Sequence, residues 1–271
     1  MATIEHIDEW QKRYEHWEQG RTRGSPRSEV GSDYPYVKNT RAPFAPARRA
    51  LPMMNLALIS SAGAYLNGTD SYDINIVGGD VSFREIPREV EAEDLLYCAR
   101  GWDTAAVMQD RNAQVPIDRL AEFEGNGIIG RLNSVWWSFC GFIPDAARLA
   151  EEMVPKLVER VKRYEAQAAL LIPASKLCHQ SIGLVARGLE LEGIPTMMLA
   201  CERYVPELVR PPRCGYYKGE FGSVAGRPLW AEHQRRVLDE ALRLLEPLDQ
   251  PSIVKLAVEL ESQVEKERGE R

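Results

Sequence analysis

A serine, a cysteine and a histidine stand close together where a predicted strand gives way to a predicted helix. Ser175 occupies the N-cap position, Cys178 follows three residues later, and His179 comes next. We expect the Ser175 hydroxyl to accept the backbone N–H of Cys178. Because the positive end of a helix dipole favours thiolate, Cys178 is a candidate nucleophile and the most reactive thiol we expect in the chain. Ser175 is the alternative nucleophile, and His179 is the candidate acid or base. A buried cysteine beside an ordinary capping serine is the competing interpretation.

The elements around this turn form a predicted strand-helix-strand unit. Residues 168–172 are a short apolar run of the kind that a parallel sheet buries on both faces. Apolar residues at helical spacing predict a helix over residues 176–192, which Gly193 ends before a second strand at residues 196–200. In open α/β sheets ligands bind at the carboxyl ends of the strands. We therefore expect residues 173–179 to lie on the functional edge.

Several motifs resemble one known family. PASKLCHQSIGLVARGLELEGIPT, starting at Pro173, resembles the selenocysteine region of the D-proline reductase small subunit and, more distantly, of component B of the glycine, sarcosine and betaine reductases. Five other segments also resemble this family. The five segments are LALISSAGAYL at 56–66, FREIP at 83–87, DRNAQVPIDRL at 110–120, GIIGRL at 127–132 and SFCGFI at 138–143. The resemblance extends over roughly residues 51–245.

The chain departs from the family at the position that bears selenocysteine in the reductases. That position is Ser175 here, and Lys176 replaces the proline that follows. A serine hydroxyl is not ionised near neutral pH without a base, and it cannot form a selenide-sulfide bond with a thiol. The resemblance therefore implies a selenium-free homologue that acts on a small amino-acid-like carboxylate by Cys-based non-redox or thiol-dependent C–N bond chemistry. It also implies a larger partner subunit bearing a pyruvoyl group, while this chain itself is expected to bind no cofactor.

Two segments of similar sequence, LALISSAG and ALLIPASK, each end a predicted strand in a turn that contains serine. We expect an α/β fold of two Rossmann-like lobes with mainly parallel sheets, and an active-site cleft where the strand ends face each other. Ser60, Ser61 and Gly63 would line one wall, with a helix N-terminus after them that binds a carboxylate. An ordinary strand-to-helix turn is the alternative.

Two further residues are candidate substrate contacts. Cys140 follows a predicted strand and precedes Gly141, so it can lie on the edge of the cleft or fill the core. Asp110 precedes the helix predicted over residues 116–124, where it can cap that helix or reach the cleft.

Composition limits the class of protein. The chain has 271 residues, of which 44% are hydrophobic and 27% charged, and its net charge is −6, which disfavours a nucleic-acid or anionic-membrane binder. It contains no apolar run of about 18 residues and no secretory leader pattern, so we expect a cytoplasmic protein without a membrane span. Its five cysteines lack Cys-x-x-Cys spacing and it has four histidines, so we predict no metal site.

The predicted organisation has four parts and leaves three functions open. An N-terminal helix and extended arm occupy residues 1–50, the first lobe 51–130, the second lobe 131–246, and a helical tail that suits a homo-oligomer contact 247–271. We expect an enzyme, either a reductase-family oxidoreductase or one that cleaves C–N bonds by other means. A noncatalytic accessory subunit of a reductase-like complex is the second possibility. A two-thiol racemase or isomerase, with Cys140 and Cys178 on opposite lobes, is the third.

Overall fold

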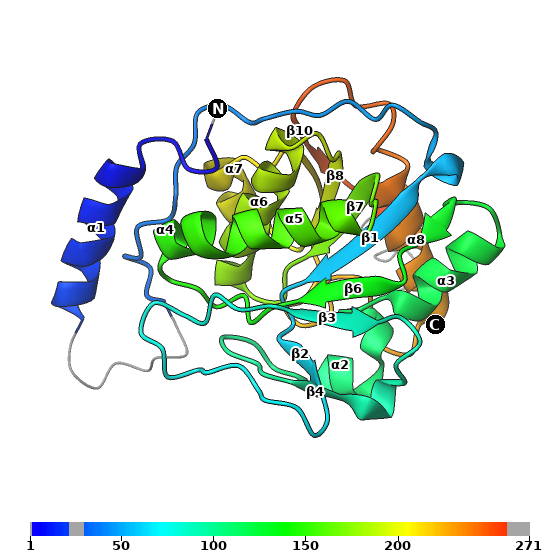
Figure 1. Cartoon of the computed structure of the whole chain (residues 1–271), viewed down its shortest axis with the longest axis horizontal. Coiled ribbons are helices and arrows are strands. Elements are labelled where there is room, and N and C mark those ends of the chain that lie inside the picture. The colour runs from blue at the N-terminus through cyan, green and yellow to red at the C-terminus, as the bar shows by residue number, and fades with distance from the viewer. Residues whose placement is uncertain (1, 22–29, 259–271) are drawn as a thin grey trace.

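The computed structural model describes residues 2–21 and 30–258 (Figure 1). Its centre is one eight-stranded sheet with the order β10-β9-β8-β7-β1-β6-β3, in which β5 also pairs with β1. All pairings in this sheet are parallel except that of β3 with β6. The strands are β1 (Asn55–Ser60), β2 (Ala64–Leu66), β3 (Arg84–Pro87), β4 (Leu95–Tyr97), β5 (Arg131–Leu132), β6 (Val135–Ser138), β7 (Ala168–Ile172), β8 (Thr196–Ala200), β9 (Arg213–Tyr216) and β10 (Ser252–Lys255).

Helices cover both faces of the sheet, which explains why β1, β7 and β8 are mostly apolar and buried along their whole length. One core packs α5, α6 and α7 against one face, and the other packs α3 and α8 against the opposite face. The α/β class with a mostly parallel sheet is confirmed. The helices are α1 (Ile7–Gly20), α2 (Ala105–Gln109), α3 (Ile117–Gly125), α4 (Ala146–Arg148), α5 (Val154–Arg163), α6 (Lys176–Leu191), α7 (Tyr204–Val209) and α8 (Ala231–Leu242).

The two similar strand ends are neighbours in this sheet and do not belong to facing lobes. β1 and β7 pair in parallel, with Ser60 opposite Ile172. Later strands extend the sheet outward from β7, while β6 and β3 lie on the far side of β1. The strand order therefore reverses between β1 and β7, which is the topological switch point where open α/β sheets bind their ligands.

The turn after β1 differs from the expectation. No helix begins after Ser60 to Gly63, because the chain continues directly into β2, which pairs antiparallel with β4. The helix N-terminus predicted on that side of the site is therefore absent from this turn. Only the β7 side contributes one, from α6.

Other elements lie close to their predicted positions. The helix predicted over residues 116–124 is present as α3, and α4 and α5 are joined by a π-helical turn at Leu149–Met153. The tail predicted as helical over residues 247–271 differs from the prediction. Its residues 252–255 form strand β10, which pairs in parallel with β9. Residues 259–271 of the predicted tail lie outside the described residues.

The N-terminal arm packs onto the body of the protein, and the segment that follows α1 passes along the top of the molecule in Figure 1. Arg187 on α6 is completely buried and fixes this arm. Its guanidinium donates to the carbonyl oxygens of Thr3 at 2.7 Å and Arg41 at 2.6 Å. One cation thereby joins α6 to a segment that lies 184 residues away in the sequence.

Candidate functional site

The Cys178 sulfur lies in the first turn of α6, at the switch point between β1 and β7. Ser175 caps the helix as predicted, since its Oγ accepts the backbone N–H of Cys178 at 3.2 Å. The same hydroxyl donates to the Cys178 Sγ at 3.0 Å. The Ser61 hydroxyl, from the end of β1, and the backbone of Ala174 lie beside this sulfur, and both favour its thiolate. Donors from two neighbouring strand ends therefore converge on one thiol.

Burial and hydrogen bonding act on this thiol in opposite directions. Cys178 is only 1% exposed, and its desolvation raises the pKa of the thiol above its usual value. The hydroxyls of Ser175 and Ser61 lower that pKa, because they stabilise the thiolate, but they do not overcome the burial. The structure therefore does not support the expectation that Cys178 is the most reactive thiol of the resting protein.

His179 faces away from Cys178 toward the end of β8. Its Nδ1 lies 2.7 Å from the carbonyl oxygen of Ser175, so this nitrogen carries the hydrogen. Its Nε2 accepts the backbone N–H of Cys201 at 3.3 Å. Burial lowers the pKa of the imidazole to about 4, so the ring is neutral near pH 7. Its two ring nitrogens are both engaged in contacts that organise the strand ends.

A neutral buried histidine predicts a loss of stability in acid. The unfolded pKa is about 6.5, so the unfolded chain takes up a proton between about pH 6.5 and 4 while folded His179 does not. The stabilisation is complete above the unfolded pKa and is lost as the pH falls toward the folded one. We expect His179→Asn, which keeps a donor near the Nδ1 position, to remove up to about 3 kcal/mol of this pH dependence. Urea unfolding at about pH 7 and about pH 4.5 measures it.

The matched control is His16→Asn, because His16 is exposed on α1. The control should keep the full pH dependence of the wild-type protein, to which buried carboxylates also contribute. A His179→Asn variant with the same pH dependence as wild type would show that His179 is not held neutral.

The turn after β1 brings Ser60 and Ser61 to different partners. Ser60 donates from its Oγ to the carbonyl oxygen of Gln114 at 3.4 Å, whereas the Ser61 Oγ accepts the backbone N–H of Ala174 at 2.9 Å. Gly63 has φ +63°, and a Cβ there would lie within 3.4 Å of the Cys98 Cβ. The backbone of Gly63 therefore approaches Cys98 closely. Of the two serines, only Ser61 contacts the Cys178 sulfur.

The backbone of Gly141 seals the Cys178 sulfur from the other side. A Cβ at this glycine would lie 2.7 Å from the Cys178 Sγ, closer than real Cβ atoms approach. The Gly141 carbonyl accepts the Ser181 hydroxyl at 2.7 Å, and its N–H donates to the Ser61 carbonyl at 3.3 Å. The segment after β6 therefore covers this sulfur. Sequence reasoning singled out the motif SFCGFI but missed Gly141 as the contact.

Two cysteines that sequence reasoning did not place also meet site residues. Cys201 follows β8, and its Sγ lies 3.8 Å from the His179 Nε2. Cys98 follows β4 and accepts the thiol of Cys140 on its carbonyl oxygen at 3.4 Å. For Cys201 the available signal was position, since it comes directly after a parallel strand, at the edge of the sheet where the strands end.

Asp110 lies outside this cluster and serves as a cap. Its carboxylate accepts the backbone N–H groups of Asn112 and Leu229, each at 2.9 Å, and the side-chain amide of Gln234 at 2.7 Å. These donors lower the pKa of the carboxyl group although burial raises it. Asp110 therefore joins the loop before α8 to the turn before α3. It caps the short 3-10 helix Arg111–Ala113 and not α3, whose N-terminus has no side-chain cap.

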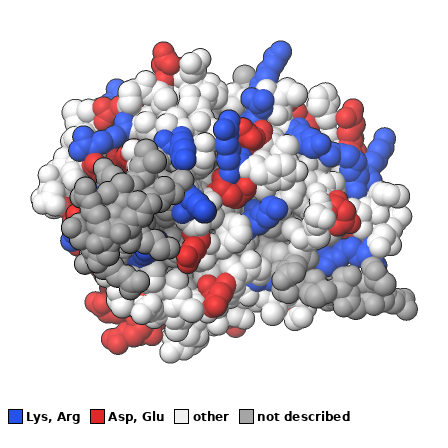
Figure 2. All heavy atoms as spheres, turned by 180° about the vertical axis from the view of Figure 1, so that it is seen from behind, with Lys and Arg blue, Asp and Glu red and all other residues white. Residues whose placement is uncertain are grey.

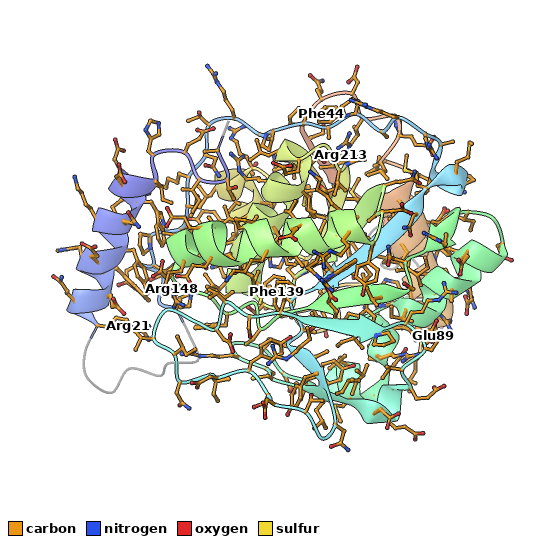
Figure 3. The ribbon with its side chains drawn as sticks, in the orientation of Figure 1. Arg21, Phe44, Glu89, Phe139, Arg148 and Arg213 are labelled. Atoms are coloured by element: carbon orange, nitrogen blue, oxygen red, sulfur yellow. The ribbon has the colours of Figure 1, made fainter. Side chains whose placement is uncertain are left out.

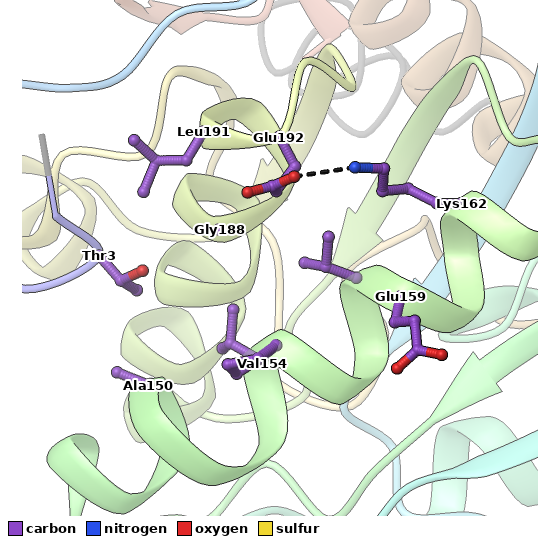
Figure 4. Close-up of a pocket in the computed structure, with 10 residues that line it drawn as sticks. Thr3, Ala150, Val154, Glu159, Lys162, Gly188, Leu191 and Glu192 are labelled. Atoms are coloured by element: carbon purple, nitrogen blue, oxygen red, sulfur yellow. Dashed lines mark hydrogen bonds and ion pairs between the residues drawn. The ribbon is translucent and has the colours of Figure 1, made fainter.

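A groove of about 360 Å³ lies between α5 and α6, far from the strand ends (Figure 4). Val154 and Gly188 line its floor, and an ion pair of 2.8 Å between Lys162 and Glu192 crosses its edge. Gly188 is near the C-terminal end of α6, whereas Cys178 is in its first turn, about 15 Å away along the helix axis. The groove and the cysteine site are therefore separate features.

The surface offers no simple electrostatic signature. Acidic and basic side chains are interspersed on the face that Figure 2 shows. Within the described residues, no helix has the length and hydrophobicity needed to cross a membrane, and no three His, Cys, Asp or Glu side chains gather as metal ligands.

Fold and site together define an open α/β protein with a cysteine at a helix N-terminus on the strand-end edge, at the topological switch point. Residues 27–174 match the family described as glycine/sarcosine/betaine reductase selenoprotein B. The chain belongs to this family.

Curated relatives agree with this assignment. D-proline reductase subunit gamma of Acetoanaerobium sticklandii is 30% identical over 214 residues, which cover 78% of this chain and 86% of the relative. Glycine reductase complex component B subunit gamma of Symbiobacterium thermophilum is 24% identical over 68% of this chain, and sarcosine reductase complex component B subunit beta of Peptoclostridium acidaminophilum is 25% identical over 62%. The chain spans 46% and 39% of the length of these two relatives. No solved structure matches the chain.

Proposed function

We propose that this protein is a selenium-free member of its family that binds a small amino-acid-like carboxylate and acts on a C–N bond with Cys178 as the reacting thiol. The observation that supports this proposal most strongly is the convergence of donors from Ser61, Ala174 and Ser175 on the Cys178 sulfur at the N-terminus of a 16-residue helix. Such donors stabilise a thiolate, and once that sulfur moves aside they suit a carboxylate equally well.

In its reductive form the reaction consumes two thiols. The C–N bond is replaced by a C–H and an N–H bond, and the two sulfurs join in a disulfide. Ser175 lies 3.0 Å from the Cys178 Sγ but has no sulfur to contribute. A small thiol from solution supplies the second sulfur in this proposal, and a thiol is regenerated by exchange.

We also propose that the chain works beside a larger partner subunit. The relatives are named as subunits, two of them of complexes. In D-proline reductase, which the sequence resembles, that partner bears a pyruvoyl group, and the proposal places any such group outside this chain. Opening of the Gly141 segment on the partner would give the substrate access to a sulfur that is 1% exposed here.

The burial of Cys178 favours a second candidate function, a noncatalytic accessory subunit. In that case the sulfur fills the core and stays closed in the complex. A two-thiol racemase gains no support, because Gly141 lies against the Cys178 sulfur and the Cys140 thiol points to Cys98. Two thiols that flank a substrate carbon would have to face each other across it.

Ligand binding tests the carboxylate part of the proposal. We expect proline, glycine, sarcosine or betaine to raise the melting temperature, because the ligand binds the folded state alone. Pyrrolidine, which is proline without its carboxylate, is the matched control and should leave the melting temperature unchanged. The assignment of a carboxylate site would be overturned if pyrrolidine and proline raised the melting temperature equally. It would also be overturned if none of these acids raised it. Thermal shift followed by calorimetry makes the comparison.

A further inference from the structure

Cys98 and Cys140 both lie against the turn after β1, where Gly63 has no side chain. The backbone N–H of Cys98 donates to the Gly63 carbonyl at 2.8 Å, and Cys140 forms an isolated antiparallel bridge with Ala62. Both cysteines therefore lie against the same short segment that follows β1. A Cβ at Gly63 would lie 2.5 Å from the Cys98 carbonyl oxygen, so any other residue there would force Cys98 away.

The two sulfur atoms are unequal. The Cys140 thiol donates to the Cys98 carbonyl oxygen at 3.4 Å, and the Cys98 thiol donates to the Tyr72 carbonyl oxygen at 3.8 Å. The influence of each cysteine on the other lowers the pKa of Cys98 and raises that of Cys140 well above its usual value. Cys140 is 5% exposed, whereas Cys98 is partly accessible. An accessible thiol that ionises readily beside a buried, protonated one is the arrangement in which the first attacks a disulfide and the second resolves the product.

We propose that Cys98 and Cys140 form a redox-active dithiol that exchanges with small disulfides of the glutathione type. The Cys98 thiolate attacks one sulfur of the small disulfide and releases one small thiolate, which takes up a proton. Cys140 then loses its proton, attacks the Cys98 sulfur in the mixed disulfide and releases the second small thiol. Two protein thiols are thereby oxidised to one disulfide, and one small disulfide is reduced to two thiols.

This site is independent of the function proposed for Cys178, because neither its geometry nor its chemistry involves a carboxylate ligand. It would give the chain a two-electron couple that Ser175 and Cys178 lack. Cys201, which follows β8, and Cys214, in the neighbouring strand β9, provide a contrast within the same fold. Burial raises the pKa of Cys201 to about 12 and that of Cys214 further, so neither is poised to start an exchange.

The test is equilibration of the full-length folded protein with mixtures of oxidised and reduced glutathione, followed by acid quench, alkylation and peptide mass mapping. We expect a peptide cross-linked through Cys98 and Cys140, two hydrogens lighter than the reduced pair, with loss of alkylation at both sites. Added dithiothreitol should restore both thiols. Cys214 should be alkylated only after unfolding in either state.

Single substitutions separate the two roles. Cys140→Ser should accumulate a glutathione adduct on Cys98 that does not resolve, whereas Cys98→Ser should leave Cys140 unmodified in the folded protein. Cys214→Ser is the matched control and should still form the cross-link. Oxidation that appears only on unfolding, a persistent Cys98 adduct in wild type, or a Cys98 cross-link to Cys178 would each overturn the proposal.

Discussion

Replacing Arg213 with alanine is expected to lower the free energy of unfolding by about 3–5 kcal/mol, because it leaves the Glu190 carboxylate buried without its counter-charge. Both side chains are completely inaccessible, and the Arg213 guanidinium lies 2.6 Å from a Glu190 carboxylate oxygen. Figure 3 shows Arg213 beside Phe44, whose ring centre is 4.0 Å from the guanidinium carbon. Urea unfolding of the purified variant measures the loss.

The pair itself is expected to contribute little net stability. Burial raises the pKa of Glu190 and lowers that of Arg213, so it disfavours both charges. The opposite charge of the partner acts against each of these shifts without overcoming it. The double variant Glu190→Gln with Arg213→Met should therefore be more stable than Arg213→Ala alone. Arg163→Ala, which breaks an exposed pair with Glu159, is the surface control and should change stability by less than about 1 kcal/mol. A loss of that small size at Arg213 would show that the Glu190 charge is not buried.

The strand-helix-strand unit around Cys178 could be predicted from sequence because every local signal agrees there. An uninterrupted apolar run predicts β7, Ser175 provides the cap, and Gly193 follows α6 in the left-handed conformation, at φ +84°. The same signals give the Ser175 hydrogen bond, and the position of the turn on the strand-end edge follows from the general geometry of parallel sheets.

The arrangement of the strands could not be predicted in the same way. Two similar strand ends suggested two facing lobes, but β1 and β7 are adjacent in one sheet, so their turns meet side by side. Nothing local distinguishes a strand that joins an existing sheet from one that begins another. β10 was interpreted as a helical tail because residues 252–255 are few and end in a charged lysine, while its pairing with β9 is a long-range contact.

Only part of the site could be predicted, because its contacts also depend on which strands are neighbours in the sheet. Ser61 and Cys178 were expected on opposite walls of a cleft, whereas the structure places them side by side, since a Cβ at Gly141 would touch both. Gly141 and Cys98 were missed, because a glycine that seals a sulfur and a cysteine beside an unrelated turn are recognisable only once the backbone segments are brought together.

Replacing Cys178 with alanine is expected to reduce thiol-dependent turnover at least about 1000-fold, since the reacting sulfur is removed and its donors cannot substitute for it. Stability should change less, because alanine leaves the Ser175 cap and the backbone of α6 in place. Cys214→Ala is the matched control. It removes an equally buried cysteine of the sheet, and turnover should stay within a fewfold of wild type.

The most direct test of the account is therefore the rate at which the protein, purified with the subunits that accompany it, consumes D-proline, glycine, sarcosine or betaine with dithiothreitol as the thiol source. We predict that wild type and Cys214→Ala consume one of these compounds in a dithiothreitol-dependent reaction. Cys178→Ala should not form the product of C–N bond cleavage. Wild-type rates in Cys178→Ala, or no consumption of any of the four by the wild-type complex, would contradict the role assigned to Cys178.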